Sequence, residues 1–272
     1  MPNDRDLAGE NPSRYFVYSI EKGFKVLEAF AEGRDRLTLT ELSERSLRNK
    51  ATVRRIALTL CDLGYLQQDG SRRFSLTPKV LDLGRRFLQA LSLPDLAEPF
   101  VSALAETTHE SANLAIRDGR DVLYVLRVAA AQRILAINLH VGSRLPIHAT
   151  SLGKALLLKA TRQDLLDILG DPPWPQYTGA TRTEPDRLLA DLAEAQSIGC
   201  ALVDGELEVG LRSIAAPVRD ASGAIVAAVN VSTHSLQVPL DQLLGPMREQ
   251  LLATARAVSQ TLGYQGESPS GR

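Results

Sequence analysis

Cysteine and histidine are scarce in this chain of 272 residues. The two cysteines, Cys61 and Cys200, lie far apart and have no histidine close by in the sequence. Two isolated thiols exclude a disulfide scaffold, argue against a zinc site and suit a reducing compartment. The four histidines, at positions 109, 140, 148 and 234, show no H-x-x-x-H or similar spacing. We therefore predict no metal site, and nothing else in the sequence indicates a cofactor.

Long apolar runs and an excess of charge of either sign are also missing. No run approaches the roughly 20 residues that a membrane-spanning helix needs. The N-terminal stretch MPNDRDLAGENPSR mixes charges and lacks the apolar core of a signal peptide. The 31 basic and 32 acidic residues leave a net charge of −1, so any nucleic-acid site must be a local basic patch. We predict a cytoplasmic protein without a membrane partner.

The region 15–76 is predicted to contain short helices and then a hairpin. Apolar residues at spacings of four, three and three define the inward face of a first helix, which Gly33 ends: Ile20, Phe24, Leu27 and Phe30. A second, short helix is predicted over 39–45, and Thr38 or Thr40 can cap it. The arrangement so far is compatible with many small helical domains.

A third helix follows after a tight break, and its two faces differ. Asn49 can cap this helix and Gly64 can end it. One face is apolar and is expected to point inward: Val53, Ile56, Leu60 and Leu63. Two short strands around Asp69-Gly70 then read as a hairpin. Two short helices, a break and a basic second helix are the helix-turn-helix arrangement, and the hairpin would be its wing.

Basic and polar side chains are concentrated on the other face of that helix and at the hairpin tip. Between residues 45 and 73 there are seven basic and two acidic residues, a net charge of +5. In a major groove, arginine reads guanine edges while lysine and threonine hold phosphates. The predicted DNA-binding residues are Arg48, Asn49, Lys50, Thr52, Arg54, Arg55, Arg72 and Arg73. The alternative is a helix with an ordinary solvated charged face.

The remainder is predicted to be a linker helix and a mixed domain. Thr77 and Pro78 open an apolar helix over 77–93, which needs a partner such as the next domain or another copy of the chain. The region 94–264 alternates strands and helices in hairpin order, which favours antiparallel pairing. We expect strands over 111–117, 122–128, 134–140, 200–204, 212–218 and 224–232, and helices over about 95–109, 185–198 and 239–262.

The stretch HATSLGKALL supports three hypotheses. Ser151 and Lys154 fit the S-x-x-K spacing of an acyl enzyme, but the S-D-N and K-T-G elements that accompany it are missing. A phosphate loop needs Ser or Thr after the lysine, where Ala155 stands. The third hypothesis is a helix start capped by Thr150 or Ser151, at which Gly153 lets an anion approach the backbone. On pattern alone, an ordinary capped helix without a ligand is favoured.

A run of acidic residues precedes a later strand. Asp204, Glu206 and Glu208 lie close together in the sequence, as the ligands of a metal or the pair of an acid/base catalyst would. A solvated acidic loop is the ordinary interpretation, and we favour it for Glu208. Cys61 is expected in the helix core and Cys200 at the start of a buried strand.

Several of these stretches together resemble the isocitrate-lyase-regulator (IclR) family of bacterial transcriptional regulators. The resemblance runs from about residue 15 to 263. Its markers are SIEKGFKVL at 19–27, KATVRR at 50–55, LGYL at 63–66, LPIHATSLGKALL at 145–157 and GLRSIAAPV at 210–218. The spacing is most similar to the branch that controls protocatechuate, hydroxybenzoate and β-ketoadipate catabolism.

The resemblance implies an α+β protein with a winged helix-turn-helix over 15–76, a dimerising linker helix over 77–93 and a GAF-like effector domain with an antiparallel sheet over 94–264. It also implies double-stranded operator DNA as a partner, a small organic or aromatic acid as effector, and homodimers that often pair into tetramers. By this resemblance Ser151, Leu152 and Gly153 hold the effector carboxylate, and Asp204 or Glu206 lines the far side. We add Arg144, His148 and Ser213 because a small acid needs hydrogen-bond donors.

One departure from the family pattern concerns the turn before the DNA-reading helix. The family has Gly there, then Leu and Ser, whereas this chain has Leu47-Arg48-Asn49. Asn49 can still cap, but leucine is a poor left-handed residue. We predict a ligand-responsive transcriptional regulator that is not an enzyme. The alternatives are a hydrolase using Ser151 and Lys154, or a small-molecule sensor that does not bind DNA.

Overall fold

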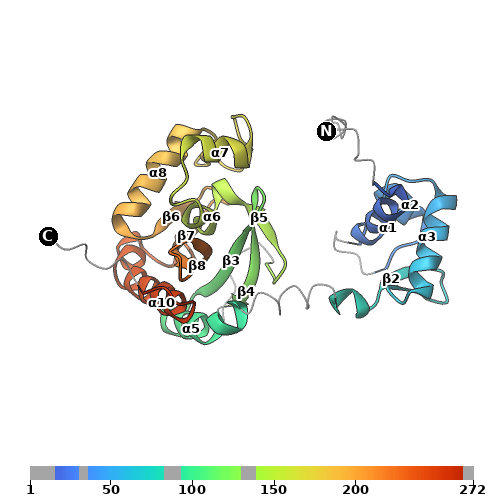
Figure 1. Cartoon of the computed structure of the whole chain (residues 1–272), viewed down its shortest axis with the longest axis horizontal. Coiled ribbons are helices and arrows are strands. Elements are labelled where there is room, and N and C mark those ends of the chain that lie inside the picture. The colour runs from blue at the N-terminus through green and yellow to red at the C-terminus, as the bar shows by residue number, and fades with distance from the viewer. Residues whose placement is uncertain (1–15, 31–35, 83–92, 130–138, 266–272) are drawn as a thin grey trace. The chain divides into compact units, whose positions relative to one another are not determined.

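The computed structural model describes residues 16–30, 36–82, 93–129 and 139–265. The chain divides into two compact units, Met1–Ala90 and Leu91–Arg272, each with its own hydrophobic core (Figure 1). The N-terminal unit contains only short elements, whereas the C-terminal unit is built on one large sheet.

The N-terminal unit has the predicted order of helices followed by a hairpin. Its elements are α1 (Tyr18–Glu28), α2 (Leu39–Arg45), α3 (Lys50–Asp62), β1 (Leu66–Gln68) and β2 (Phe74–Leu76). Thr38 caps α2 in a capping box with Glu41, and Asn49 caps α3, as predicted. The strands β1 and β2 pair antiparallel, and Leu37 adds a bridge to Phe74 at the edge of the hairpin. The helix-turn-helix and its wing are therefore confirmed.

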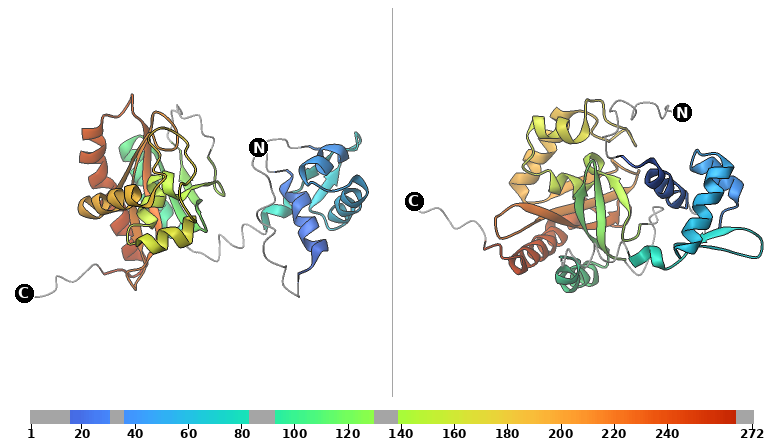
Figure 2. Two further views of the ribbon diagram at one scale, coloured as in Figure 1. Left: turned by 90° about the horizontal axis from the view of Figure 1, so that it is seen from above. Right: turned by 45° about the vertical axis from the view of Figure 1, so that its right-hand side comes forward.

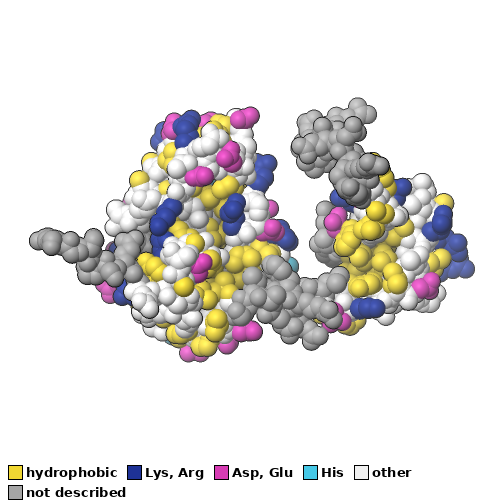
Figure 3. Space-filling model, in the orientation of Figure 1, with side chains coloured by type: hydrophobic (Ala, Val, Ile, Leu, Met, Phe, Trp, Pro, Cys, Tyr) yellow, Lys and Arg dark blue, Asp and Glu magenta, His cyan; other side chains and the backbone are white. Residues whose placement is uncertain are grey.

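The core of this unit differs in part from the predicted apolar faces. Val53 and Leu60 of α3 are buried, together with Val26 of α1, but Leu63 is 53% exposed because it caps the end of α3. Ile20 and Phe24 were expected to face inward, yet they are 57% and 55% exposed. Within the described part of this unit α1 packs mainly on α3, and that contact does not bury Ile20 or Phe24. An apolar surface is left on this unit (Figure 3).

The turn between α2 and α3 requires a left-handed residue, and Leu47 supplies it. Its φ is +52°, a region that costs a residue with a Cβ about 1–2 kcal/mol. The Leu47 side chain is 70% exposed and makes no core contact that would offset this cost. The turn is closed instead by Ser43 Oγ, which donates to the Arg48 carbonyl at 2.6 Å. The turn is left-handed at Leu47 although no glycine stands there.

Replacing Leu47 by glycine is expected to stabilise the N-terminal unit by about 0.5–1 kcal/mol. Relief of the left-handed strain outweighs the extra backbone entropy of glycine in the unfolded chain. Urea unfolding of the full chain measures the difference. Leu47→Ala is the control, because alanine keeps the Cβ and should not stabilise. Equal stability of the glycine and alanine variants would show that the turn is unstrained.

The C-terminal unit is a six-stranded antiparallel sheet in the order β5-β4-β3-β8-β7-β6. The strands are β3 (Ser111–Asp118), β4 (Asp121–Val128), β5 (Arg144–Pro146), β6 (Ala201–Asp204), β7 (Leu211–Arg219) and β8 (Ile225–His234). The helices are α5 (Leu93–Thr108), α6 (Ser151–Leu156), α7 (Arg162–Leu169), α8 (Pro185–Ile198), α9 (Leu240–Gln242) and α10 (Arg248–Thr261). The predicted α+β class with antiparallel pairing is confirmed.

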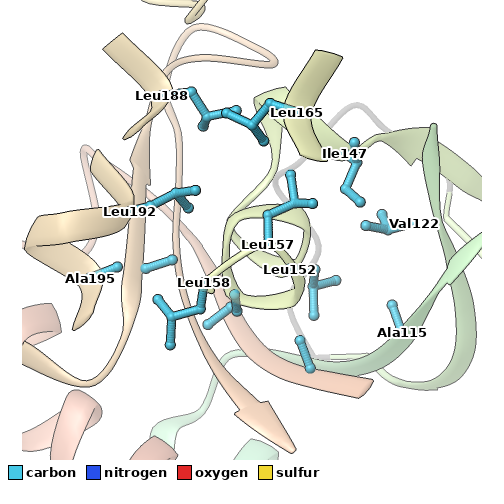
Figure 4. Close-up of a cluster of buried hydrophobic side chains, with 14 of the residues drawn as sticks. Ala115, Val122, Ile147, Leu152, Leu157, Leu158, Leu165, Leu188, Leu192 and Ala195 are labelled. Carbon is cyan, nitrogen blue, oxygen red and sulfur yellow. The ribbon is translucent and has the colours of Figure 1, made fainter. Parts of the chain in front are cut away.

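Helices cover both faces of this sheet. The two helices α5 and α10 pack on one face, and α6, α7 and α8 lie on the other (Figures 1 and 2). The short helix α6 lies across β7 and β8 near the centre of the sheet. Its Leu152 is completely buried in a core that also contains Ala115 of the sheet, Leu165 of α7 and Leu188 of α8 (Figure 4). The face that carries α6 is called the inner face below.

Several sequence predictions for this unit need correction. The strands over 111–117, 122–128, 200–204, 212–218 and 224–232 and the helices over 95–109 and 185–198 are present within a few residues. The edge strand β5 and the helix α7 were not predicted. The expected helix over 239–262 is broken by a kink at Gly245, whose backbone is not helical (φ −95°, ψ −108°), because the following Pro246 lacks the N–H that a regular helix needs. Most of the predicted strand 134–140 and of the linker helix 77–93 lies outside the described residues, although 79–82 is helical.

Candidate functional sites

The exposed face of α3 presents basic side chains. Lys50, Arg54 and Arg55 are exposed, and none forms an ion pair with a residue in the described ranges. Thr52 is half-buried beside them. Lysine and arginine side chains gather along one edge of the N-terminal unit (Figure 3). Unpaired cations on an exposed helix can be neutralised by phosphates and can hydrogen-bond to base edges.

Two of the predicted DNA-binding residues, Arg48 and Asn49, stabilise the helix-turn-helix instead of adding to its exposed basic surface. Asn49 Oδ1 accepts a hydrogen bond from the Thr52 amide at 2.9 Å, so its side chain is used as the cap. Arg48 donates to Glu21 Oε1 of α1 at 2.7 Å. This ion pair ties the turn to α1. The structure therefore gives Arg48 and Asn49 roles in positioning α3.

The hairpin tip carries the other two predicted residues. Arg72 and Arg73 are both exposed, and Arg72 has a φ of +59° in the turn. Asp69 Oδ1 accepts hydrogen bonds from the amides of Ser71 and Arg73, which holds the tip in shape. Both arginine side chains are thus presented at the end of the wing.

The start of α6 is capped as the third hypothesis predicted. Thr150 Oγ1 accepts from the Gly153 amide at 3.2 Å. A Cβ on Gly153 would lie 1.8 Å from the Ile147 carbonyl oxygen, so glycine is needed for the packing of the chain on itself. Ser151 is 1% exposed, and its Oγ has no hydrogen-bond partner among the described residues. A buried hydroxyl without a partner costs free energy, which a bound acceptor would recover.

Lys154 is completely buried in an ion network. Its Nζ lies 2.5 Å from Asp191 Oδ2 and 2.5 Å from Glu206 Oε1, and Arg182 Nε also donates to Asp191 Oδ2 at 2.9 Å. An acyl-enzyme nucleophile must be hydrogen-bonded to its base. Here the lysine is engaged by two carboxylates and the Ser151 hydroxyl is not bonded to it. The S-x-x-K hypothesis is not supported.

The buried carboxyl of Glu206 belongs to this network and not to an exposed acidic loop. Burial raises the pKa of Glu206, while the ammonium of Lys154 opposes that rise. Its second oxygen, Oε2, has no partner among the residues described. Asp204 is more exposed and is paired with Arg212 at 2.7 Å. The two acidic residues that the sequence grouped therefore have different ion-pair partners.

Two of the residues that were predicted to donate to the effector, Arg144 and His148, are bonded to other groups of the protein. Arg144 lies on the edge strand β5 and forms a surface ion pair with Asp118 at 2.7 Å. His148 is buried, and its Nε2 is 2.9 Å from the Pro175 carbonyl oxygen, so Nε2 donates and Nδ1 is an unpartnered acceptor. Burial lowers the pKa of His148, which keeps the ring neutral. Neither side chain is arranged as a donor to an acid.

A row of polar side chains crosses the inner face of the sheet. Asn113 and Asn230 face each other across β3 and β8, and each lies two residues from an alanine that packs in the same core as Leu152. Side chains two residues apart on a strand share a face, so both asparagines lie on the inner face. The same argument adds Arg127 opposite Asn113 on β4, and Ser232 opposite Ser213 on β8 and β7. These five residues are called the polar row.

Hydrogen bonds run through the polar row in one direction. Arg127 donates to Asn113 Oδ1 at 3.0 Å, Asn113 Nδ2 donates to Asn230 Oδ1 at 2.8 Å, and Asn230 Nδ2 donates to Ser232 Oγ at 3.0 Å. The Ser232 hydroxyl has no acceptor of its own among the described residues. Hydrogen bonds in a chain polarise one another, so a chain that begins at a positively charged guanidinium makes its last hydroxyl a stronger donor. Ser232 is therefore set to donate to a negatively charged oxygen.

Sequence reasoning found Ser213 but missed the other four residues of the row. The available signal was a single asparagine inside an apolar strand, Ala112-Asn113-Leu114 and Val229-Asn230-Val231. A lone buried amide in such a run requires a polar partner. The direction of the side chain, inward or outward, follows only from the register of the sheet.

Two family models cover most of the chain. The IclR helix-turn-helix domain matches residues 19–70, and the C-terminal domain of the bacterial transcriptional regulator IclR matches residues 85–260. The chain belongs to the IclR family of bacterial transcriptional regulators. The resemblance seen in the sequence is confirmed.

Individual relatives agree with this assignment. The chain is 39% identical over 247 residues to the Pca regulon regulatory protein of Pseudomonas putida, covering 91% of this chain and 84% of that protein. A crystal structure of a transcriptional regulator from Rhodococcus sp. RHA1 has a TM-score of 0.80 and 38% identity, with 91% and 98% of the two chains covered. An IclR homologue of Microbacterium hydrocarbonoxydans, solved in complex with 4-hydroxybenzoate, has a TM-score of 0.79 and 26% identity, with 90% and 98% covered.

No helix within the described ranges is both long enough and apolar enough to cross a membrane. Across those same ranges, histidine, cysteine and carboxylate side chains form no group of three or more that could bind a metal ion.

Proposed function

We propose that this protein is a cytoplasmic, DNA-binding regulator of aromatic-acid catabolism genes that responds to a small organic acid. Its relative in Pseudomonas putida is named for the Pca regulon, and a homologue binds 4-hydroxybenzoate. The observation that carries the proposal is the polar row, a directed chain of donors that ends at the Ser232 hydroxyl, for whose proton the described residues offer no acceptor.

The DNA site of this proposal is the exposed face of α3 with the wing. Lys50, Thr52, Arg54 and Arg55 enter the major groove, and the two arginines of the hairpin tip contact the backbone. Arg48 and Asn49 hold the turn that orients α3. The exposed apolar residues of α1, including Ile20 and Phe24, support self-association into the dimers that two DNA half-sites require.

The effector site of this proposal is formed by the inner face of the sheet and the start of α6. Ser232 and Ser213 donate to the carboxylate, and Ser151 adds its unpartnered hydroxyl from α6. Gly153 and Leu152 shape the start of the helix instead of binding through their side chains. Glu206 contributes indirectly, because its ion pair with Lys154 fixes α6. The proposed domain limits are 15–76, 77–93 and 94–264.

A thermal-shift screen of the full chain tests the effector. The panel is protocatechuate, 4-hydroxybenzoate, β-ketoadipate, succinate and glyoxylate. A ligand at about 100 times its Kd stabilises the folded state by about 2.7 kcal/mol, so a true effector raises Tm by several degrees. Ser151→Ala and Ser232→Ala are each expected to weaken binding about tenfold, since each removes a hydrogen bond to a charged group.

Ser222→Ala, in the exposed turn between β7 and β8, is the matched control and should bind normally. If no acid shifts Tm while the protein still binds its promoter region, the effector part of the proposal is wrong and the DNA part stands. If an acid binds but Ser151→Ala and Ser232→Ala bind it as well as the unchanged protein does, the effector lies elsewhere.

A further inference from the structure

A cavity of about 170 Å³ lies between α8 and β6. Its β6 residues, Leu202 and Asp204, alternate with Ala201 and Val203 along the strand. Val203 pairs with Ser213 and so lies on the inner face, which places Leu202 and Asp204 on the opposite side of the strand. None of the five residues of the polar row is among the residues that line this cavity. An engineered cavity of about 150 Å³ binds benzene, so this one has room for a small organic molecule.

Carboxylates outnumber cations among the residues that line the cavity. Four carboxylates line it, against a single guanidinium: Asp191, Glu194, Asp204, Glu206 and Arg182. Two further cations do not line the cavity but form ion pairs with its carboxylates: Lys154 with Glu206, and Arg212 with Asp204. Arg248 adds a further cation beside the lining residues Ile198 and Cys200, so an incoming cation must be attracted by carboxylate oxygens that have no donor of their own.

One of the lining carboxylates is incompletely paired. Glu206 is 3% exposed, Lys154 occupies its Oε1, and its Oε2 has no partner among the residues that the structure describes. A buried carboxylate oxygen without a donor is costly. Ala195, Ile198 and Leu202 line the cavity with apolar surface. The cavity thus combines an anionic end with an apolar wall.

We infer that the cavity between α8 and β6 is a second ligand site, separate from the acid effector site, for a small organic ammonium compound. The ammonium lies at Glu206 and Glu194 and the hydrocarbon part lies against Ile198 and Leu202. An inorganic cation would leave the apolar wall without a partner. A carboxylate ligand would be repelled by the four lining carboxylates. A bound ammonium donates to the Glu206 oxygen that Lys154 leaves open.

Isothermal titration of the full chain with n-butylammonium, butan-1-ol and butyrate tests this site. We expect saturable binding of n-butylammonium with a Kd on the order of 1 mM, as befits a ligand of five heavy atoms. Butan-1-ol has the same shape without the charge and should bind at least about tenfold more weakly. Butyrate should not bind here.

Variants locate the binding. Glu194→Gln and Glu206→Gln should each weaken n-butylammonium about five- to tenfold. Leu202→Phe fills the cavity and should abolish binding. Glu249→Gln, an exposed glutamate on α10, is the matched control and should leave the Kd unchanged. If Glu206→Gln does not fold, Glu194→Gln and Leu202→Phe still decide the question.

Four results would each overturn the inference. The unchanged protein could take up no n-butylammonium, or butan-1-ol could bind as tightly as the ammonium. Binding could also survive Leu202→Phe, or fall equally in Glu249→Gln, which would mean surface association only. The acid effector is absent from this titration. The result for n-butylammonium therefore does not depend on whether the proposed effector site is correct.

Discussion

Changing Arg54 and Arg55 together to alanine is expected to lower the affinity for promoter DNA by a factor of about 100 or more. Both side chains are exposed on α3 and lack an ion-pair partner among the described residues, so no internal contact is lost. A base contact by arginine contributes about 1–3 kcal/mol, and a phosphate contact contributes to affinity at every sequence. Fluorescence anisotropy with the promoter fragment gives the affinity.

The salt dependence of the same measurement separates the two kinds of contact. Each lost phosphate contact reduces the slope of log K against log salt by about one, whereas loss of a base contact leaves the slope and relaxes the sequence preference. Arg256→Ala, an exposed arginine on α10, is the control for the loss of positive charge. The thermal shift by the effector should be unaffected in both variants.

Unchanged affinity and salt slope in the double variant would show that α3 is not the recognition helix. The chain would then be a sensor that acts without DNA contact through this face. Arg48→Ala is expected to behave differently from the double variant, because the ion pair of Arg48 with Glu21 orients the turn. Its DNA affinity should fall together with the stability of the N-terminal unit.

Local signals explain why the N-terminal unit could be predicted well. Caps and turns such as Thr38, Asn49 and Gly64 depend on a few neighbouring residues, and the structure places all three as expected. The local sequence also predicted that Leu47 stands in the turn although leucine is a poor left-handed residue. The structure shows Leu47 in the left-handed conformation. Ile20 and Phe24 were misassigned because a helical period identifies an apolar face but not the element that covers it.

The candidate sites of the C-terminal unit were less predictable because their contacts are long-range. Lys154 meets Asp191 and Glu206, which follow it by 37 and 52 residues. Asn113 meets Asn230 across 117 residues. No periodicity within one element encodes such pairs; they follow from the order of strands and from the position of α6 on the sheet. Single residues such as Glu206 could be named from the sequence, but their partners could not.

Lys154→Met is expected to destabilise the C-terminal unit by about 3–5 kcal/mol. The change removes the cation that is hydrogen-bonded to the Glu206 carboxylate, which is 4% exposed, and leaves only the more distant Arg182 as a counter-ion. At about 2–4 °C per kcal/mol for a unit of this size, Tm falls by about 10 °C. Lys159→Met, an exposed lysine just after α6, should change stability by less than about 0.5 kcal/mol.

The loss of stability caused by Lys154→Met should also depend on pH. Burial raises the pKa of Glu206 in the folded protein, and loss of Lys154 removes the charge that opposes this rise. A carboxyl whose pKa is higher in the folded than in the unfolded state binds more protons when folded, so stability falls as pH rises through that interval. The deficit should therefore be largest at and above neutral pH and shrink toward pH 5. Thermal unfolding from pH 5 to 8 measures it.

The double variant Lys154→Met with Glu206→Leu decides between an electrostatic and a packing cause. Replacing a buried ion pair by apolar residues of similar volume is often neutral, so most of the lost stability should return and the pH dependence should disappear. If the double variant is as unstable as Lys154→Met, the lysine acts through its shape or through Asp191 alone. If Lys154→Met is as stable as the unchanged protein at every pH, the network does not hold α6 in place, and the start of that helix must be positioned by Thr150 and the core contacts of Leu152.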